Sequence, residues 1–156
     1  MLLIHCRDGY VNMHDFKHLF LSEYIAEEAM KMELNLSDIT KSEFNCINEY
    51  LIHMLEAHNL KPPVIARPLR TKPDLDEYEM KLFDSMSIDS ALRYATISEY
   101  LRLSCFNDLC CAKIAYEMIG LKTMQLRQKF GIEDDFTNEE KFEIDDYFDW
   151  VSIFQK

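Results

Sequence analysis

FGIEDDFTNEE, residues 130–140, is the stretch that defines the C-terminal third of this chain of 156 residues. Gly131 can adopt the left-handed conformation in which helices often end, so a short helix over 124–129, capped by Thr123, is expected to stop there. Thr137-Asn138-Glu139-Glu140 has the form of a capping box, in which hydroxyl and carboxylate each bind a free backbone N–H. The stretch therefore predicts a short helix, a turn and a final helix that begins at about residue 138.

Aromatic side chains are concentrated in the same region. Seven of them lie in the last 27 residues: Phe130, Phe136, Phe142, Tyr147, Phe148, Trp150 and Phe154. Each buries roughly 150–250 Å² when covered, whereas a monomer rarely exposes an apolar patch beyond a few hundred Å². Two short helices cannot cover so much apolar surface by themselves. It is expected to dock on the chain's own core or to form an interface with a partner.

A proline-rich segment divides the rest of the chain. All four prolines, Pro62, Pro63, Pro68 and Pro73, lie within residues 61–76. Proline lacks a backbone donor and disfavours helix at the preceding residue, so this segment is expected to be extended or irregular. The predicted organisation is an N-terminal core over 1–60, a linker over 61–76 and a helical half over 77–156.

The N-terminal half has the patterns of a small sheet with helices. Asp8-Gly9 between two apolar runs predicts a hairpin, because glycine accepts a positive φ at little cost. Thr40-Lys41-Ser42-Glu43 is a second capping box and predicts the start of a helix whose apolar residues share one face. The expected elements before that helix are strands over 2–4, 10–13 and 34–36 and helices over 15–21 and 22–30.

The region after the linker has helical periodicity. Apolar side chains form one stripe from Ile88 to Leu101 and another from Phe106 to Met118, where the pattern stops before Gly120. We interpret the two stripes as a helical hairpin.

Across residues 97–150 the chain resembles the adaptors of the Skp family, which belong to Skp–cullin–F-box ubiquitin ligases. The matching positions are Tyr100-Leu101, Asp108, Cys111, Ile114-Ala115, Gly120, Arg127, Phe130, Ile132, Asp135-Phe136-Thr137, Glu139-Glu140 and Trp150. Over the first sixty residues the resemblance rests on Asp8-Gly9, Ser22 and the helix carrying Ile47 and Tyr50. It implies an α+β, BTB/POZ-type fold, a small three-stranded sheet with helices, plus a C-terminal helical extension that embraces an F-box.

The resemblance also implies a function without catalytic residues or cofactors. F-box-binding positions would be Ile114, Met118, Phe130, Ile132, Phe136 and Trp150, and the cullin-binding position would be Tyr100. Such a chain is expected to bridge an F-box substrate receptor to a cullin scaffold for ubiquitin-dependent protein degradation. The alternative is a Skp-like scaffold that binds F-box proteins in a non-ligase assembly such as a kinetochore complex.

Composition excludes other classes of function. A net charge of −11 opposes binding to nucleic acid, and no apolar run approaches the roughly 18 residues that a membrane span needs. With three glycines in the chain, there is no glycine-rich loop to hold a phosphate, so no small-molecule substrate is expected. The N-terminus does not resemble a secretory signal, and five cysteines without C-x-x-C spacing suit reduced thiols. We expect a cytoplasmic and nuclear protein.

Two other features have a chemical interpretation. His14 and His18 are four residues apart, the spacing of a helical metal pair, which makes a small metal-dependent enzyme a third hypothesis. The sequence supplies no third ligand, so no metal site is predicted. Cys110 and Cys111 lie in an apolar stripe and are interpreted as buried thiols.

Overall fold

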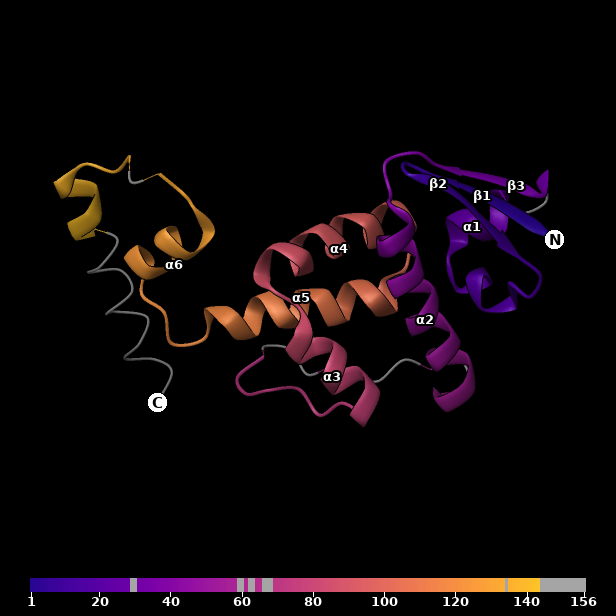
Figure 1. Ribbon diagram of the computed structural model, residues 1–156. Helices are drawn as coiled ribbons and strands as arrows, with labels where there is room; N and C mark the ends of the chain where they lie inside the picture. The colour runs from indigo at the N-terminus through magenta and orange to yellow at the C-terminus, as the bar shows by residue number, and fades with distance from the viewer. Residues whose placement is uncertain (29–30, 59–60, 62–63, 66–68, 134, 144–156) are drawn as a thin grey trace. The chain divides into compact units, whose positions relative to one another are not determined.

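A computed structural model of the chain describes residues 1–28, 31–58, 61, 64–65, 69–133 and 135–143 (Figure 1). The chain divides into two compact units. We call Met1–Ile119 the N-terminal unit and Gly120–Lys156 the C-terminal unit. None of the described helices is both long enough and apolar enough to cross a membrane.

A three-stranded sheet opens the N-terminal unit. Strands β1 (Leu2–Cys6), β2 (Gly9–Met13) and β3 (Glu33–Leu36) are ordered β2-β1-β3. The β1–β2 pair is an antiparallel hairpin, and Gly9 has the positive φ of 136° that its turn requires. The β1–β3 pair is parallel. A parallel pair needs a crossover, which here contains the 3-10 helix η1 (Lys17–Leu21) and helix α1 (Glu23–Glu28).

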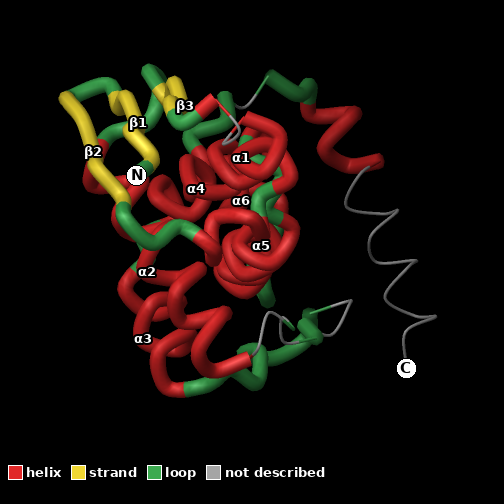
Figure 2. Tube along the Cα trace, turned by 90° about the vertical axis from the view of Figure 1, so that its right-hand side faces the viewer, coloured by secondary structure: helices red, strands yellow, loops and turns green. Residues whose placement is uncertain are grey.

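Longer helices build the rest of the N-terminal unit. They are α2 (Lys41–His58), α3 (Glu77–Ser85), α4 (Ile88–Tyr100) and α5 (Ser104–Met118). Helix α2 runs from the sheet toward α3, and α4 and α5 lie side by side as a hairpin (Figures 1 and 2).

The core of this unit is shared by residues on both sides of the proline-rich segment. Phe106 on α5 is fully buried, with its ring centroid 4.8 Å from that of Tyr50 on α2 and 5.7 Å from that of Tyr94 on α4. Aromatic pairs at these separations contribute beyond the area that they bury. Segments before and after the linker therefore depend on each other for burial. The domain boundaries at residues 60 and 77 stay a prediction.

The end of α4 is fixed by residues near the N-terminus. The Ser22 hydroxyl donates to the Leu101 carbonyl oxygen at 2.5 Å and accepts from the backbone N–H of Ile25 at 3.0 Å. Arg102 follows with a φ of 52° and forms an ion pair with Glu27 at 3.1 Å. A left-handed φ is uncommon for a residue other than glycine, so these contacts hold a tight turn between α4 and α5.

The C-terminal unit contains helix α6 (Thr123–Phe130) and a further helical stretch over 138–143. The α+β fold, its three strands and its C-terminal helices are thus confirmed. Helix α6 ends at Gly131, which has the left-handed φ of 64° that was expected. Thr123, however, is the first residue of the helix and not its cap. The predicted helix over 22–30 is also shorter, because α1 ends at Glu28.

Both capping boxes form. The Glu43 carboxylate accepts from the Thr40 backbone N–H at 2.8 Å, and the Thr40 hydroxyl accepts from the Glu43 N–H at 3.2 Å. The same pair of bonds joins Thr137 and Glu140, at 2.8 and 3.3 Å. Each box satisfies two backbone donors that a helix start would otherwise leave unpaired.

Glu43 is expected to make the stability of the fold depend on pH in the acid range. Its carboxylate also accepts from Arg93 on α4, Nε to Oε1 at 2.8 Å. The bond from Arg93, with help from Thr40, lowers the pKa of Glu43 to about 2. Because its pKa is lower in the folded state, ionised Glu43 stabilises the fold at pH values above its unfolded pKa of about 4.3. This stabilisation is lost as the pH falls toward 2. Unfolding by urea between about pH 7 and pH 2.5 should show this loss.

In the Glu43→Gln variant we expect about 1–2 kcal/mol less stability at neutral pH, with a flatter fall below about pH 4.5. Arg93 is partly exposed, so the effect of the full pKa shift is reduced by solvent. Glu77→Gln is the matched control, since Glu77 is 86% exposed beside Lys81. Identical acid profiles for the wild type and Glu43→Gln would contradict this assignment.

Candidate functional site

The predicted F-box-binding positions lie in both units. On α5, Ile114 packs partly against the core, whereas Met118 is 40% exposed. In the C-terminal unit, Phe130 is half-buried at the end of α6 and Ile132 is 57% exposed just after it. Phe136 is also in this unit, and Trp150 lies outside the described residues.

An arginine organises the turn after α6. The Arg127 guanidinium donates to the carbonyl oxygen of Glu133 at 2.5 Å, and lies 3.3 Å from the Asp135 carboxylate. It also lies over the ring of Phe136, 4.1 Å from the centroid, in a cation–π contact. The backbone N–H of Ile132 donates a hydrogen bond to the Arg127 carbonyl oxygen at 2.9 Å. These bonds set the positions of Ile132 and Phe136 relative to α6.

The described part of the C-terminal unit has no fully buried residue. None of the described residues between 120 and 143 is buried, and α6 has no buried position. Several large apolar side chains are well exposed: Met124 at 56%, Ile132 at 57%, Phe136 at 37% and Phe142 at 74%. Exposed apolar groups in such number are typical of an interaction surface.

Tyr100 is part of a second exposed feature, at the end of α4. Its ring is 52% exposed and lies 5.0 Å, centroid to centroid, from that of Tyr24 on α1. The Tyr100 hydroxyl donates to the Tyr24 hydroxyl at 3.0 Å, and this bond, with partial burial, raises the pKa of Tyr100 to about 12. Tyrosines that combine an apolar ring with a polar tip are frequent at protein interfaces.

A pocket of about 360 Å³ adjoins Tyr100. It is lined by Arg7, Leu36, Ser37, Asp38, Ile39, Arg93, Thr96, Ile97 and Tyr100. We call Tyr24, Tyr100 and this pocket the tyrosine face. The family resemblance singled out Tyr100 but not Tyr24, which is 76 positions away along the chain.

Other predicted features have plain structural roles. The ring Nε2 of His18 lies 2.7 Å from the Asn48 side-chain oxygen, and His18 is buried whereas His14 is exposed. Within the described residues these two histidines do not form a group that could hold a metal. Cys110 is buried, as interpreted from the sequence, but Cys111 is exposed. Adjacent side chains on a helix point in different directions, which explains the difference.

Comparison with known proteins finds the same resemblance over most of the chain. Residues 107–151 match the family described as "Skp1 family, dimerisation domain". An "S-phase kinase-associated protein 1 homolog" of Tetrahymena thermophila is 27% identical over 139 residues, 86% of this chain and 81% of that protein. "SKP1-like protein 1A" of Arabidopsis thaliana is 25% identical over 126 residues, 80% of this chain and 77% of that protein.

A third similar protein is the "E3 ubiquitin ligase complex SCF subunit sconC" of Arthroderma benhamiae, 29% identical over 84 residues, 53% of this chain and 49% of that protein. The family match includes most of α5, all of α6 and the turn held by Arg127. The chain is therefore similar to the Skp1 family, the resemblance that its sequence indicated, and it has diverged from these relatives to 25–29% identity.

Proposed function

We propose that this protein is the adaptor subunit of a Skp–cullin–F-box E3 ubiquitin ligase. In this proposal α5 and the C-terminal unit bind an F-box protein, and the tyrosine face binds a cullin. The adaptor brings a substrate receptor to the ligase scaffold for ubiquitin-dependent degradation and takes no chemical part in ubiquitin transfer.

The observation that carries the proposal is the exposed apolar surface of the C-terminal unit. Its large apolar side chains lie inside the stretch that matches the Skp1 family, and none of its described residues is buried. Helices that bury no side chain gain little stability from packing, so a partner that covers them would stabilise them. An F-box protein is the partner that the resemblance to the Skp1 family suggests.

The tyrosine face supports a separate partner. It is formed by α1, α4, the β1–β2 turn, the end of β3 and the β3–α2 connection, and all of its residues belong to the N-terminal unit. Its aromatic pair is accompanied by charged side chains, Arg7, Asp38 and Arg93, beside an apolar floor that includes Leu36 and Ile97. An apolar centre with a polar rim is the usual composition of an interface between proteins that also exist apart.

Size-exclusion chromatography of the chain with an F-box protein and a cullin N-terminal domain tests the proposal. A complex of all three proteins is the expected result. An F-box complex that never recruits the cullin would contradict the ligase function and favour the non-ligase scaffold, such as a kinetochore subunit. No complex with any of several F-box proteins would contradict both.

The tyrosine face gives a specific prediction. In Tyr100→Ala the exposed ring and its bond to Tyr24 are lost, so affinity for the cullin domain should fall by at least about 1 kcal/mol, or fivefold. Isothermal titration calorimetry with the preformed F-box complex measures this change. Tyr10→Ala is the matched control, because Tyr10 is 66% exposed on β2, a strand that does not line the pocket. Equal cullin affinity in both variants would place the cullin elsewhere.

A further inference from the structure

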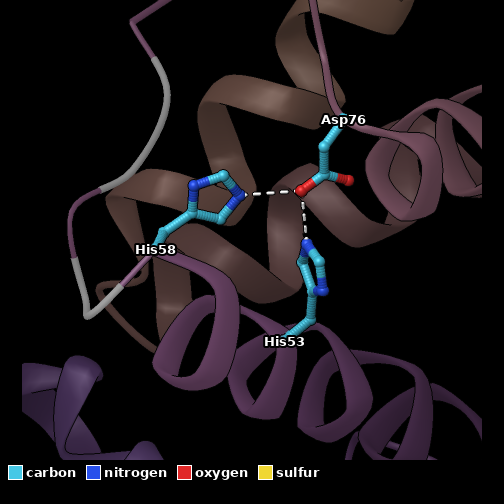
Figure 3. A group of neighbouring side chains, drawn as sticks. All are labelled: His53, His58 and Asp76. Carbon is cyan, nitrogen blue, oxygen red and sulfur yellow. Dashed lines mark hydrogen bonds and ion pairs between the residues drawn. The ribbon is translucent and has the colours of Figure 1, made fainter.

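Three polar side chains converge between the end of α2 and the start of α3. His53 and His58 belong to α2, and Asp76 is the residue before α3 (Figure 3). The Nε2 atom of His53 lies 2.6 Å from Asp76 Oδ2, and the Nε2 atom of His58 lies 2.8 Å from the same oxygen. One ligand atom from each residue lies within 4.8 Å of the others. We call these residues the α2–α3 cluster.

Local structure holds each of these groups in place. The His53 ring stacks on Tyr78, with centroids 4.4 Å apart and planes 27° apart. Asp76 is the N-cap of α3, where its Oδ1 accepts from the Glu79 backbone N–H at 2.9 Å. Since Oδ1 is used by the cap, Oδ2 is the atom that faces the two imidazoles. The rings therefore meet a carboxylate whose position is fixed by a helix start.

Glu79 adds an independent observation. It is fully buried, and its Oε2 lies 3.8 Å from the Nε2 atom of His58. Its other oxygen, Oε1, is buried and has no hydrogen-bond partner within the described part of the chain. Burial raises the pKa of this carboxyl group. A buried carboxyl group that adjoins His58 and lacks a full set of hydrogen bonds is a group that a bound cation would satisfy.

We propose that His53, His58 and Asp76, with Glu79 as fourth ligand, bind one Zn²⁺ ion. Two imidazole nitrogens with carboxylate oxygens suit zinc and neighbouring first-row metals, whereas Mg²⁺ and Ca²⁺ prefer oxygen ligands alone. Bonds of about 2.0–2.1 Å in a tetrahedral site separate the ligand atoms by about 3.3 Å. The Asp76 oxygen would therefore move away from each imidazole by less than about 1 Å.

The position of the cluster defines what the ion would do. His53 and His58 lie on one side of the proline-rich segment, and Asp76 and the proposed fourth ligand Glu79 lie on the other. An ion bound there joins α2 to α3, and because the unfolded chain does not hold these side chains together, its binding stabilises the folded state. With four protein ligands the site would be structural, in keeping with the adaptor function proposed above.

Zinc binding to the full-length, tag-free chain after treatment with a chelator tests the proposal. We expect one Zn²⁺ per chain, bound with a dissociation constant below about 10 µM, and a melting temperature several degrees higher with zinc present. Co²⁺ should bind the same site and show the visible absorption of a tetrahedral ion without thiolate charge transfer. That spectrum separates this site from one built on cysteines, of which Cys111 is exposed.

Variants locate the ion. His53→Gln, His58→Gln and Asp76→Asn should each weaken zinc binding at least about tenfold, and Asp76→Asn retains a side chain that can cap α3. His14→Gln and Cys111→Ser are matched controls and should bind zinc as the wild type does. Melting in the presence of a chelator shows that each variant folds. No binding at 100 µM zinc, or equal binding by the cluster variants and the controls, would overturn the proposal.

Discussion

Replacement of Phe106 by alanine is expected to lower the free energy of unfolding by about 3–5 kcal/mol. The ring is completely buried and lies between those of Tyr50 and Tyr94, which come from α2 and α4. The variant loses the favourable transfer free energy of a large apolar group. It also has a cavity between three helices, which the structure can fill only in part. The loss is a large part of the roughly 5–15 kcal/mol that stabilises most domains.

Urea unfolding followed by circular dichroism measures this effect. Phe20→Ala is the matched control, since Phe20 is 49% exposed and its ring centroid lies 5.9 Å from that of Phe16. We expect the control to lose about 1 kcal/mol or less. A loss of similar size in both variants would mean that Phe106 does not join the three helices in the way described.

The second large effect is expected on F-box binding. Combining Phe130→Ala with Phe136→Ala should weaken binding by more than about 2 kcal/mol, or thirtyfold. A few buried aromatic side chains usually supply most of the binding energy of an interface, and these variants remove two of them. Phe136 is already oriented by Arg127 in the free chain, so little ordering of this ring is needed on binding. Calorimetric titration with an F-box protein gives the affinity. Trp150→Ala is expected to act in the same direction, by more than about 1 kcal/mol.

Tyr100→Ala is the reciprocal control, because it should retain F-box affinity while it loses cullin affinity. The double phenylalanine variant should in turn keep its N-terminal unit folded, since neither ring belongs to that unit. Unchanged F-box affinity in both the double variant and Trp150→Ala would show that the interface lies elsewhere on the chain.

Local signals in the sequence were sufficient to predict much of the fold. The capping boxes at Thr40 and Thr137 and the left-handed Gly131 each act within four residues, so their sequences contain the interacting groups. Asp76 and Glu79 form a capping box of the same kind, which was not predicted although both residues are in the sequence at the required spacing. This capping box is a local signal for the start of α3.

The site residues that escaped prediction depend on contacts between distant segments. His53 and Asp76 are 23 positions apart, and Tyr24 and Tyr100 are 76 apart. Neither separation has a periodicity or a motif that marks the pair, since only the packing of α2 on α3 or of α1 on α4 brings them together. His14 and His18, in contrast, had a familiar spacing, but one ring is buried beside Asn48.

The bond from Ser22 to Leu101 also affects the order in which the protein can be assembled during synthesis. It joins residues 79 positions apart, and Glu27 and Arg102 form an ion pair beside it across 75. A ribosome releases the N-terminal residues first, so the tyrosine face has only one of its two rings until α4 has left the exit tunnel. A growing chain thus cannot present a complete tyrosine face before most of its N-terminal unit has been made.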